Sequence, residues 1–136
     1  MFRYFEYSRV TEGGEIMDLI VPGKVEANVL SFGGNDFIVS VSGEDADITA
    51  FAQMQHSALA IEELTVDAFM ALAKESEQIR AINYSVAREI AKRYSIADEI
   101  GMMKRAETDQ KRVAYEAYVD SCKTEGDARK AELGYA

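Results

Sequence analysis

The sequence predicts an α+β fold in which a small, mostly antiparallel sheet comes first and helices follow. Three observations lead to this prediction. Residues 1–43 alternate between apolar runs and glycine turns, and from Thr65 onwards apolar residues recur every three or four positions. The 136 residues suit one ordinary domain, and strands followed by helices are typical of α+β proteins. We therefore expect a strand-rich part over 1–64 and a helical part over 65–136, forming either one compact domain or a domain with a helical extension.

Four apolar segments of the front half predict strands, because they are rich in β-branched and aromatic residues and end at turn residues. They cover residues 2–7, 16–21, 25–32 and 37–42. The glycine pairs at 13–14 and 33–34 mark turns, and the only proline, Pro22, closes the second strand. The last two strands should pair as a hairpin across a four-residue loop.

A short helix is predicted over 45–56, because Ile48, Phe51 and Ala52 follow at helical spacing. Asp45 or Asp47 can cap its start. Residues 58–64 then predict one more strand of the same sheet. We expect this helix and the next one to pack on one face of the sheet.

A long helix is predicted from Thr65, a suitable N-cap, through residue 95 without a proline or glycine. Its apolar stripe has one gap, at Ser76; the members are Val66, Phe69, Leu72, Ala73, Ile79, Ile82, Val86, Ile90 and Tyr94. A helix of about 29 residues would be about 43 Å long. That is more than a small sheet can cover, so it should protrude, kink or pack against a partner.

Two shorter helices are predicted at the end of the chain and should form a helical hairpin. Ser95 and Asp98 have the spacing of a capping box, which starts a helix over 96–104. The second helix covers 113–123 and carries Cys122, with Gly126 placed to end it.

No group of residues predicts catalysis, a cofactor or a metal. His56 is the only histidine and Cys122 the only cysteine, 66 positions apart, with no ligand motif around either. The acidic run at 43–47 lacks the pattern of a calcium loop, and the glycine pairs lack that of a phosphate loop. We expect no enzyme activity, although two acids converging in a deep cleft, as in glycosidases, would favour a carboxylate enzyme instead.

The charge and composition of the chain limit the kinds of partner that it is expected to bind. The net charge is −9, of which residues 1–64 carry −8. An acidic front half repels phosphate, so we expect no nucleic-acid binding. No apolar run approaches the roughly 18 residues of a membrane span, and the start lacks a signal-peptide pattern. A single cysteine suits a virion or the host cytoplasm.

A family resemblance is carried by residues 94–105, YSIADEIGMMKR, and 115–123, YEAYVDSCK. Together these resemble the end segment of small tailed-bacteriophage structural proteins, over about 30 residues in common residue types. In that family, a helix with a tyrosine–serine pair, an acid pair and an arginine precedes a Y-x-x-Y-V-acid helix. Gly101 departs from the pattern, where a bulkier helix former is expected. The resemblance implies a virion or tail-assembly component.

The sequence therefore predicts a structural or assembly protein that acts through protein–protein contacts. Its partners would be further copies or virion components; the alternative is a bacterial adaptor or regulatory binding module with a preformed pocket. The predicted interface residues are Ile79, Ile82, Tyr84, Val86, Ile90, Met102, Tyr115 and Tyr118. The apolar stripe would be covered in one of two ways. Either neighbouring chains cover it, or the last two helices fold back over it, using Ile96, Ile100, Met103, Val113 and Tyr118.

Overall fold

The computed structural model describes residues 1–136 and has the expected α+β fold, with a small antiparallel sheet and five α-helices. The chain forms two compact units. The sheet unit comprises residues 1–80 and 133–135, and the helical unit comprises residues 81–132 and 136. The units thus do not divide at residue 64. Helix α2 (Val66–Ala73) and the first residues of α3 (Glu77–Arg93) belong with the sheet because they pack on it.

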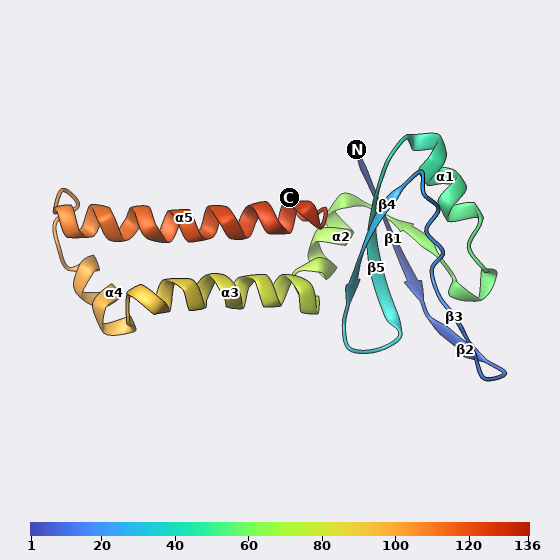
Figure 1. Ribbon diagram of the computed structural model, residues 1–136, viewed down its shortest axis with the longest axis horizontal. Coiled ribbons are helices and arrows are strands. Elements are labelled where there is room, and N and C mark those ends of the chain that lie inside the picture. Colours follow the sequence, from blue (N-terminus) through green and yellow to red (C-terminus); the bar gives the residue numbers. More distant parts are fainter. The chain divides into compact units, whose positions relative to one another are not determined.

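The main sheet has four antiparallel strands in the order β4-β5-β1-β6 (Figure 1). They are β1 (Phe2–Ser8), β4 (Glu26–Ser31), β5 (Asp36–Ser42) and β6 (Glu62–Leu64). The predicted hairpin of the third and fourth segments is confirmed as β4 and β5. The segment predicted as a strand over 16–21 is shorter, β3 (Glu15–Met17). It pairs with β2 (Val10–Glu12) in a separate hairpin around Gly13 and Gly14, which both have positive φ.

Helices pack on both faces of the sheet, which corrects the prediction of one face. Tyr4 and Phe5 are neighbours on β1, so their side chains point to opposite faces. Phe5 meets Phe51 of α1 (Asp45–Gln53) edge-on at 5.8 Å between ring centroids. Tyr4 stacks on Phe69 of α2 at 4.2 Å. The buried core on the α1 side comprises Phe5, Tyr7, Val25, Val39, Val41, Ile48, Phe51 and Leu59.

The single helix predicted over 65–95 is two helices, and Ser76 lies at the break. This buried side chain donates its hydroxyl to the Ala73 carbonyl at 2.6 Å, where α2 ends. It also accepts from the Ile79 N–H at 3.3 Å, where α3 begins. One serine therefore satisfies a backbone group of each helix at the break. The predicted cap at Thr65 is confirmed, since it accepts from the Ala68 N–H at 3.2 Å.

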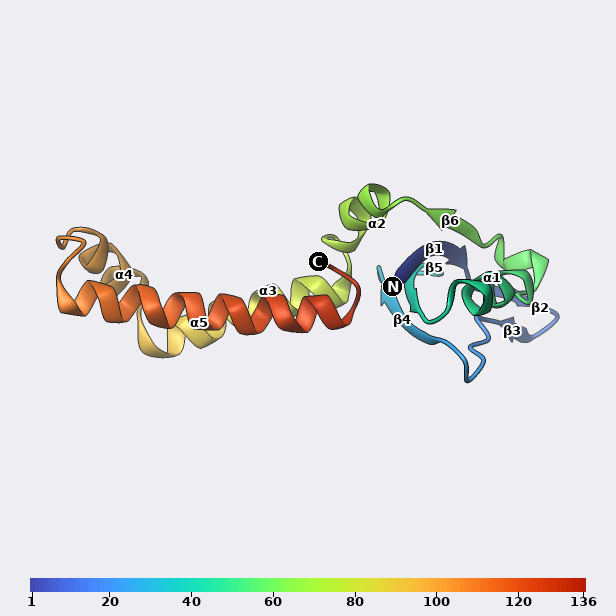
Figure 2. The same ribbon diagram turned by 90° about the horizontal axis from the view of Figure 1, so that it is seen from above.

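In the helical unit, α5 (Gln110–Glu132) runs antiparallel beside α3 (Figures 1 and 2). The Tyr118 hydroxyl donates to the Glu89 carbonyl at 2.7 Å, and Arg129 donates to Ser85 at 3.2 Å. Helix α5 thus pairs with α3, and the predicted hairpin of 96–104 with 113–123 is present in part, because α4 also contacts α5 through Glu99 and Tyr115. Helix α4 (Ile96–Met103) is the connection between them, and Gly126 does not end α5.

No helix of the chain is both long enough and apolar enough to cross a membrane.

Candidate functional site

Helix α4 begins at a complete capping box, as the sequence predicts. The Ser95 hydroxyl accepts from the Asp98 N–H at 3.1 Å, and the Ser95 N–H donates to the Asp98 carboxylate at 2.9 Å. The bond from the Ser95 backbone, followed by that from its side chain, holds the pKa of Asp98 below its usual value. Two backbone donors at the helix start are thereby satisfied, which fixes where α4 begins.

Polar contacts also tie α4 and the loop after it to α5. The Tyr115 hydroxyl donates to the Glu99 carboxylate at 2.8 Å, and this bond is the main reason that the pKa of Tyr115 is raised. Arg112 donates to the Arg105 carbonyl at 2.7 Å. An isolated helix of eight residues is marginal in water, so these bonds and the capping box keep α4 formed.

The apolar side chains of α4 are nevertheless uncovered. Not one residue of this helix is buried. Ile96 is 77% exposed, Ile100 54% and Met103 59%. Their spacing of four and three residues places them on one side of the helix. We call these three residues the α4 face. Together with Glu99, Lys104 and Tyr115 they line a shallow hollow of about 400 Å³.

The structure places most of the predicted interface residues inside the chain's own packing. Ile79, Ile82 and Tyr115 are buried, and Val86, Ile90, Met102 and Tyr118 are half-buried. Tyr84 alone of the eight is exposed. The apolar stripe is therefore covered by the sheet unit at Ile79 and by α5 further along, so of the two expected ways of covering it, folding back of the last helix is the one the structure shows.

The sequence prediction misses the α4 face, because it assigns Ile96, Ile100 and Met103 to covering the stripe. Two signals in the sequence do point to it. The capping box marks a helix, and its three apolar residues have helical spacing. Which of two apolar surfaces is covered depends on tertiary packing, however, and no local pattern decides it.

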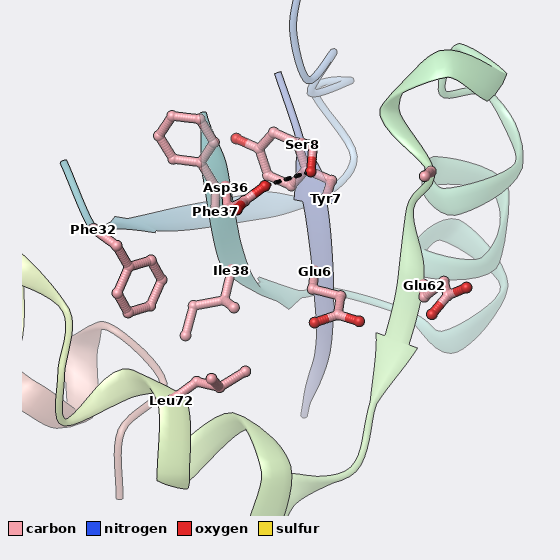
Figure 3. A pocket seen from close by; sticks show the side chains of 10 residues that line it. Glu6, Tyr7, Ser8, Phe32, Asp36, Phe37, Ile38, Glu62 and Leu72 are labelled. Carbon is pink, nitrogen blue, oxygen red and sulfur yellow. Dashed lines mark hydrogen bonds between the residues drawn. The ribbon is translucent and has the colours of Figure 1, made fainter. Parts of the chain in front are cut away.

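A second surface is a hollow of about 570 Å³ in the sheet unit, between the sheet and α2 (Figure 3). The side chains of Phe32, Ile38 and Leu72 form its apolar part, and Figure 3 shows Ile38 and Leu72 directed toward each other. Three carboxylates, Glu6, Asp36 and Glu62, also line it. We call this hollow the acidic groove.

The carboxylates of the acidic groove are arranged by the strands. Glu6 of β1 lies directly opposite Glu62 of β6 in the antiparallel register. Asp36, at the start of β5, accepts a hydrogen bond from the Ser8 hydroxyl at 2.6 Å. Glu62 is exposed, so the facing pair Glu6 and Glu62 lies at an open groove rather than in a closed cleft.

The residues with metal-binding or nucleophilic side chains are dispersed. No three or more His, Cys, Asp or Glu side chains gather in a group that could hold a metal ion. His56 caps the short 3₁₀ turn Ser57–Leu59, where its Nδ1 accepts from the Ala58 N–H at 3.0 Å. Cys122 is half-buried on α5. The structure does not bring His56 and Cys122 into one unit.

No protein-family model, curated protein or solved structure matches this chain. The resemblance of residues 94–105 and 115–123 to tailed-phage structural proteins therefore stays a prediction. The two surfaces that the structure offers for a function are the α4 face and the acidic groove.

Proposed function

We propose that this chain is a non-enzymatic structural or assembly protein of a phage particle that docks on other protein chains through the α4 face. The observation that carries the proposal is a capped, ordered helix whose three large apolar side chains are all exposed. Burying an aliphatic side chain of this kind gains about 1.5–3 kcal/mol. Three together can contribute a substantial part of a protein–protein affinity.

The surroundings of the α4 face suit a protein partner. Charged residues of both signs flank it, among them Asp98, Glu99, Lys104 and Arg105. The helical unit as a whole has ten acidic and ten basic residues. An apolar centre with a mixed polar rim is the usual anatomy of a protein–protein interface, in which methionine is enriched.

The phage assignment is supported by where the resemblance lies. Residues 94–105 include all of α4, and residues 115–123 lie in the part of α5 that carries Tyr115 and Tyr118. The neighbouring genes test this assignment. We expect them to encode tail, portal or lysis proteins. Neighbours that belong to a bacterial regulatory or metabolic gene cluster would contradict it.

The docking surface is tested with two variants of α4. Ile100→Glu places a carboxylate within the α4 face, whereas Ala97→Glu places one at an exposed position outside it. We expect the wild type and Ala97→Glu to associate with rising concentration in sedimentation equilibrium, and Ile100→Glu to remain monomeric. A wild type that is monomeric up to about 1 mM, where a free energy of about −4.1 kcal/mol would suffice for association, and whose binding to the other proteins of the particle is unchanged in Ile100→Glu, would contradict the proposal. So would association of Ile100→Glu at the wild-type level.

The alternative, an adaptor or regulatory binding module, is favoured by the acidic groove, which is a preformed pocket of about 570 Å³. Ligand pockets are commonly about 300–1,000 Å³ in volume. An adaptor would bind a soluble partner in this groove without needing the α4 face. The same two variants distinguish the functions, since Ile100→Glu would leave such partner binding unchanged.

A further inference from the structure

We infer that the acidic groove of one copy receives the α4 face of a second copy, so that the chains join head to tail. This inference rests on the proposed function, because it names the surface on which the α4 face docks. It is carried by the match of two surfaces in apolar character and in charge.

The first match is apolar. Within the groove, Phe32 is 37% exposed and Leu72 39% exposed, so both present carbon surface to solvent. The buried Ile38 lies beside them, with its side chain directed toward Leu72 (Figure 3). Exposed apolar side chains of this kind are buried most favourably against apolar side chains of a partner. The side chains of Ile96, Ile100 and Met103 are the matching apolar groups on the chain.

The second match is in charge. Glu6, Asp36 and Glu62 line the groove, and no basic residue does. Two like charges directly opposite on neighbouring strands destabilise a sheet, and Glu6 and Glu62 are such a pair. An occupant that brings a cation beside an apolar anchor would relieve this repulsion. The groove thus selects for an apolar segment flanked by lysine or arginine.

The end of the helical unit has an apolar face with lysine and arginine directly after it, although Asp98 and Glu99 also lie on α4. Lys104 and Arg105 directly follow the α4 face, and Lys111 and Arg112 open α5. Arg105 is paired with Asp109 and Arg112 with Glu116, whereas Lys104 and Lys111 are in no ion pair within the chain. These two lysines are available to the carboxylates of a groove.

The charges of the two units favour the same pairing. The sheet unit has fourteen acidic and five basic residues, a net charge of −9, while the helical unit is neutral. Contact between two sheet units would bring like charges together, which disfavours it. Contact of a sheet unit with a helical unit avoids that repulsion.

The inferred contact joins two different surfaces, so it is heterologous. Each copy then has one α4 face and one groove, and the contact repeats until a ring closes or a filament grows. This arrangement makes a specific demand. Loss of either surface should stop growth of the assembly. A copy that has lost only its α4 face and a copy that has lost only its groove should still bind each other through the two surfaces that remain.

Charge reversal in the groove tests the inference. Glu62→Lys places a lysine opposite Glu6, where an opposite-charge pair replaces a like-charge pair, so the fold should not be weakened. Glu15→Lys makes the same change in net charge at an exposed site on β3, outside the groove. We expect Glu62→Lys to associate at least about tenfold more weakly than the wild type and Glu15→Lys to stay within about twofold. Thermal unfolding of both variants verifies that the fold is retained.

Mixing completes the test, at a concentration where Glu62→Lys and Ile100→Glu are each monomeric alone. Ile100→Glu keeps its groove, and Glu62→Lys keeps its α4 face. We therefore expect an equimolar mixture to form a 1:1 dimer and nothing larger in sedimentation velocity. A mixture that remains monomeric would overturn the head-to-tail contact.

The single variants separate the two proposals. If Glu62→Lys associates as Glu15→Lys does while Ile100→Glu does not, the groove is not the receptor, yet docking through the α4 face stands. If both Glu62→Lys and Ile100→Glu associate as the wild type does, the inference and the proposed function are both wrong.

Discussion

Gly126 of α5 lies directly against Val86 of α3. A methyl group on Gly126 would come within 2.5 Å of Val86 Cγ2 and 3.8 Å of Ile82 Cγ2. Valine is β-branched and has one strongly preferred rotamer in a helix, so Val86 cannot readily turn away. The glycine weakens the helix by about 1 kcal/mol relative to alanine, and in exchange it permits the close approach of α3 and α5.

The first prediction follows from this contact. Gly126→Ala should destabilise the helical unit by about 1–2 kcal/mol, because overpacking outweighs the gain in helix propensity. The matched control is Gly101→Ala on α4, where an added Cβ meets nothing within 4 Å. The control should be neutral or stabilising by up to about 1 kcal/mol. Urea unfolding followed by circular dichroism measures both, and equal stabilisation by the two changes would show that the contact is unimportant.

The second prediction concerns Ser76, which is fully buried and bonded to both α2 and α3. Ser76→Ala leaves the Ala73 carbonyl without the serine hydroxyl and the Ile79 N–H without its acceptor. An unsatisfied buried polar group costs about 1–3 kcal/mol, so we expect a loss of stability of that size. Ser121→Ala, at an exposed position of α5, should change the free energy of unfolding by less than about 0.5 kcal/mol. Equal effects of the two variants would contradict the role of Ser76.

The third prediction is that the two units differ in local stability. The sheet unit has a core on both faces of its sheet, whereas Ile82 and Tyr115 are the only large apolar side chains buried in the helical unit. Regions with few buried apolar contacts open more readily. Amide hydrogens of α5 should therefore exchange faster than those of β1 and β5 in the dilute protein. Slowest exchange in α5 would be evidence against this ranking.

The fourth prediction is a pH dependence of α4. Hydrogen bonds from Ser95 lower the pKa of Asp98 in the folded helix. A carboxylate with a lowered pKa stabilises the fold above its unfolded value of about 3.9, and this contribution is lost as pH falls through the folded value. Helix α4 should therefore be unchanged between pH 5 and pH 8 and fray below about pH 4. Nuclear magnetic resonance of α4 amides measures this, and the Asp98→Asn variant should lack the transition.

Much of the fold could be predicted because it depends on local chemistry. Thr65 is a residue type that caps helices, and Ser95 is followed by the aspartate that completes its capping box, so both helix starts are visible in the sequence. Ser76 is visible in the sequence as a gap in the apolar stripe. That it joins the ends of α2 and α3 could not be predicted, because this depends on the burial of its side chain in the folded sheet unit. Tyr4 and Phe5 are adjacent aromatic residues on β1, yet the sequence predicts helices on one face only, because local spacing does not show which helix covers which face.

The candidate surfaces could not be predicted in the same way. The acidic groove combines Glu6, Phe32, Glu62 and Leu72, which are far apart in the sequence and are brought together only by strand pairing and by α2. The α4 face is bare although α4 contacts α5 through Glu99 and Tyr115, because that contact is made by another part of α4. Residue spacing predicts an apolar side of α4 but does not decide whether that side is covered, and it gives no sign of the groove.

The central claim is that the α4 face is covered when the protein works, and oxidation of its methionine tests this most directly. Met103 on the α4 face is 59% exposed, and Met54, beyond the end of α1, is 46% exposed. Both should be oxidised readily in the dilute protein, since oxidation follows exposure. On association or assembly we expect Met103 to become protected while Met54 continues to react. A ratio of the two oxidation rates that stays the same from the dilute protein to the full assembly would contradict the claim.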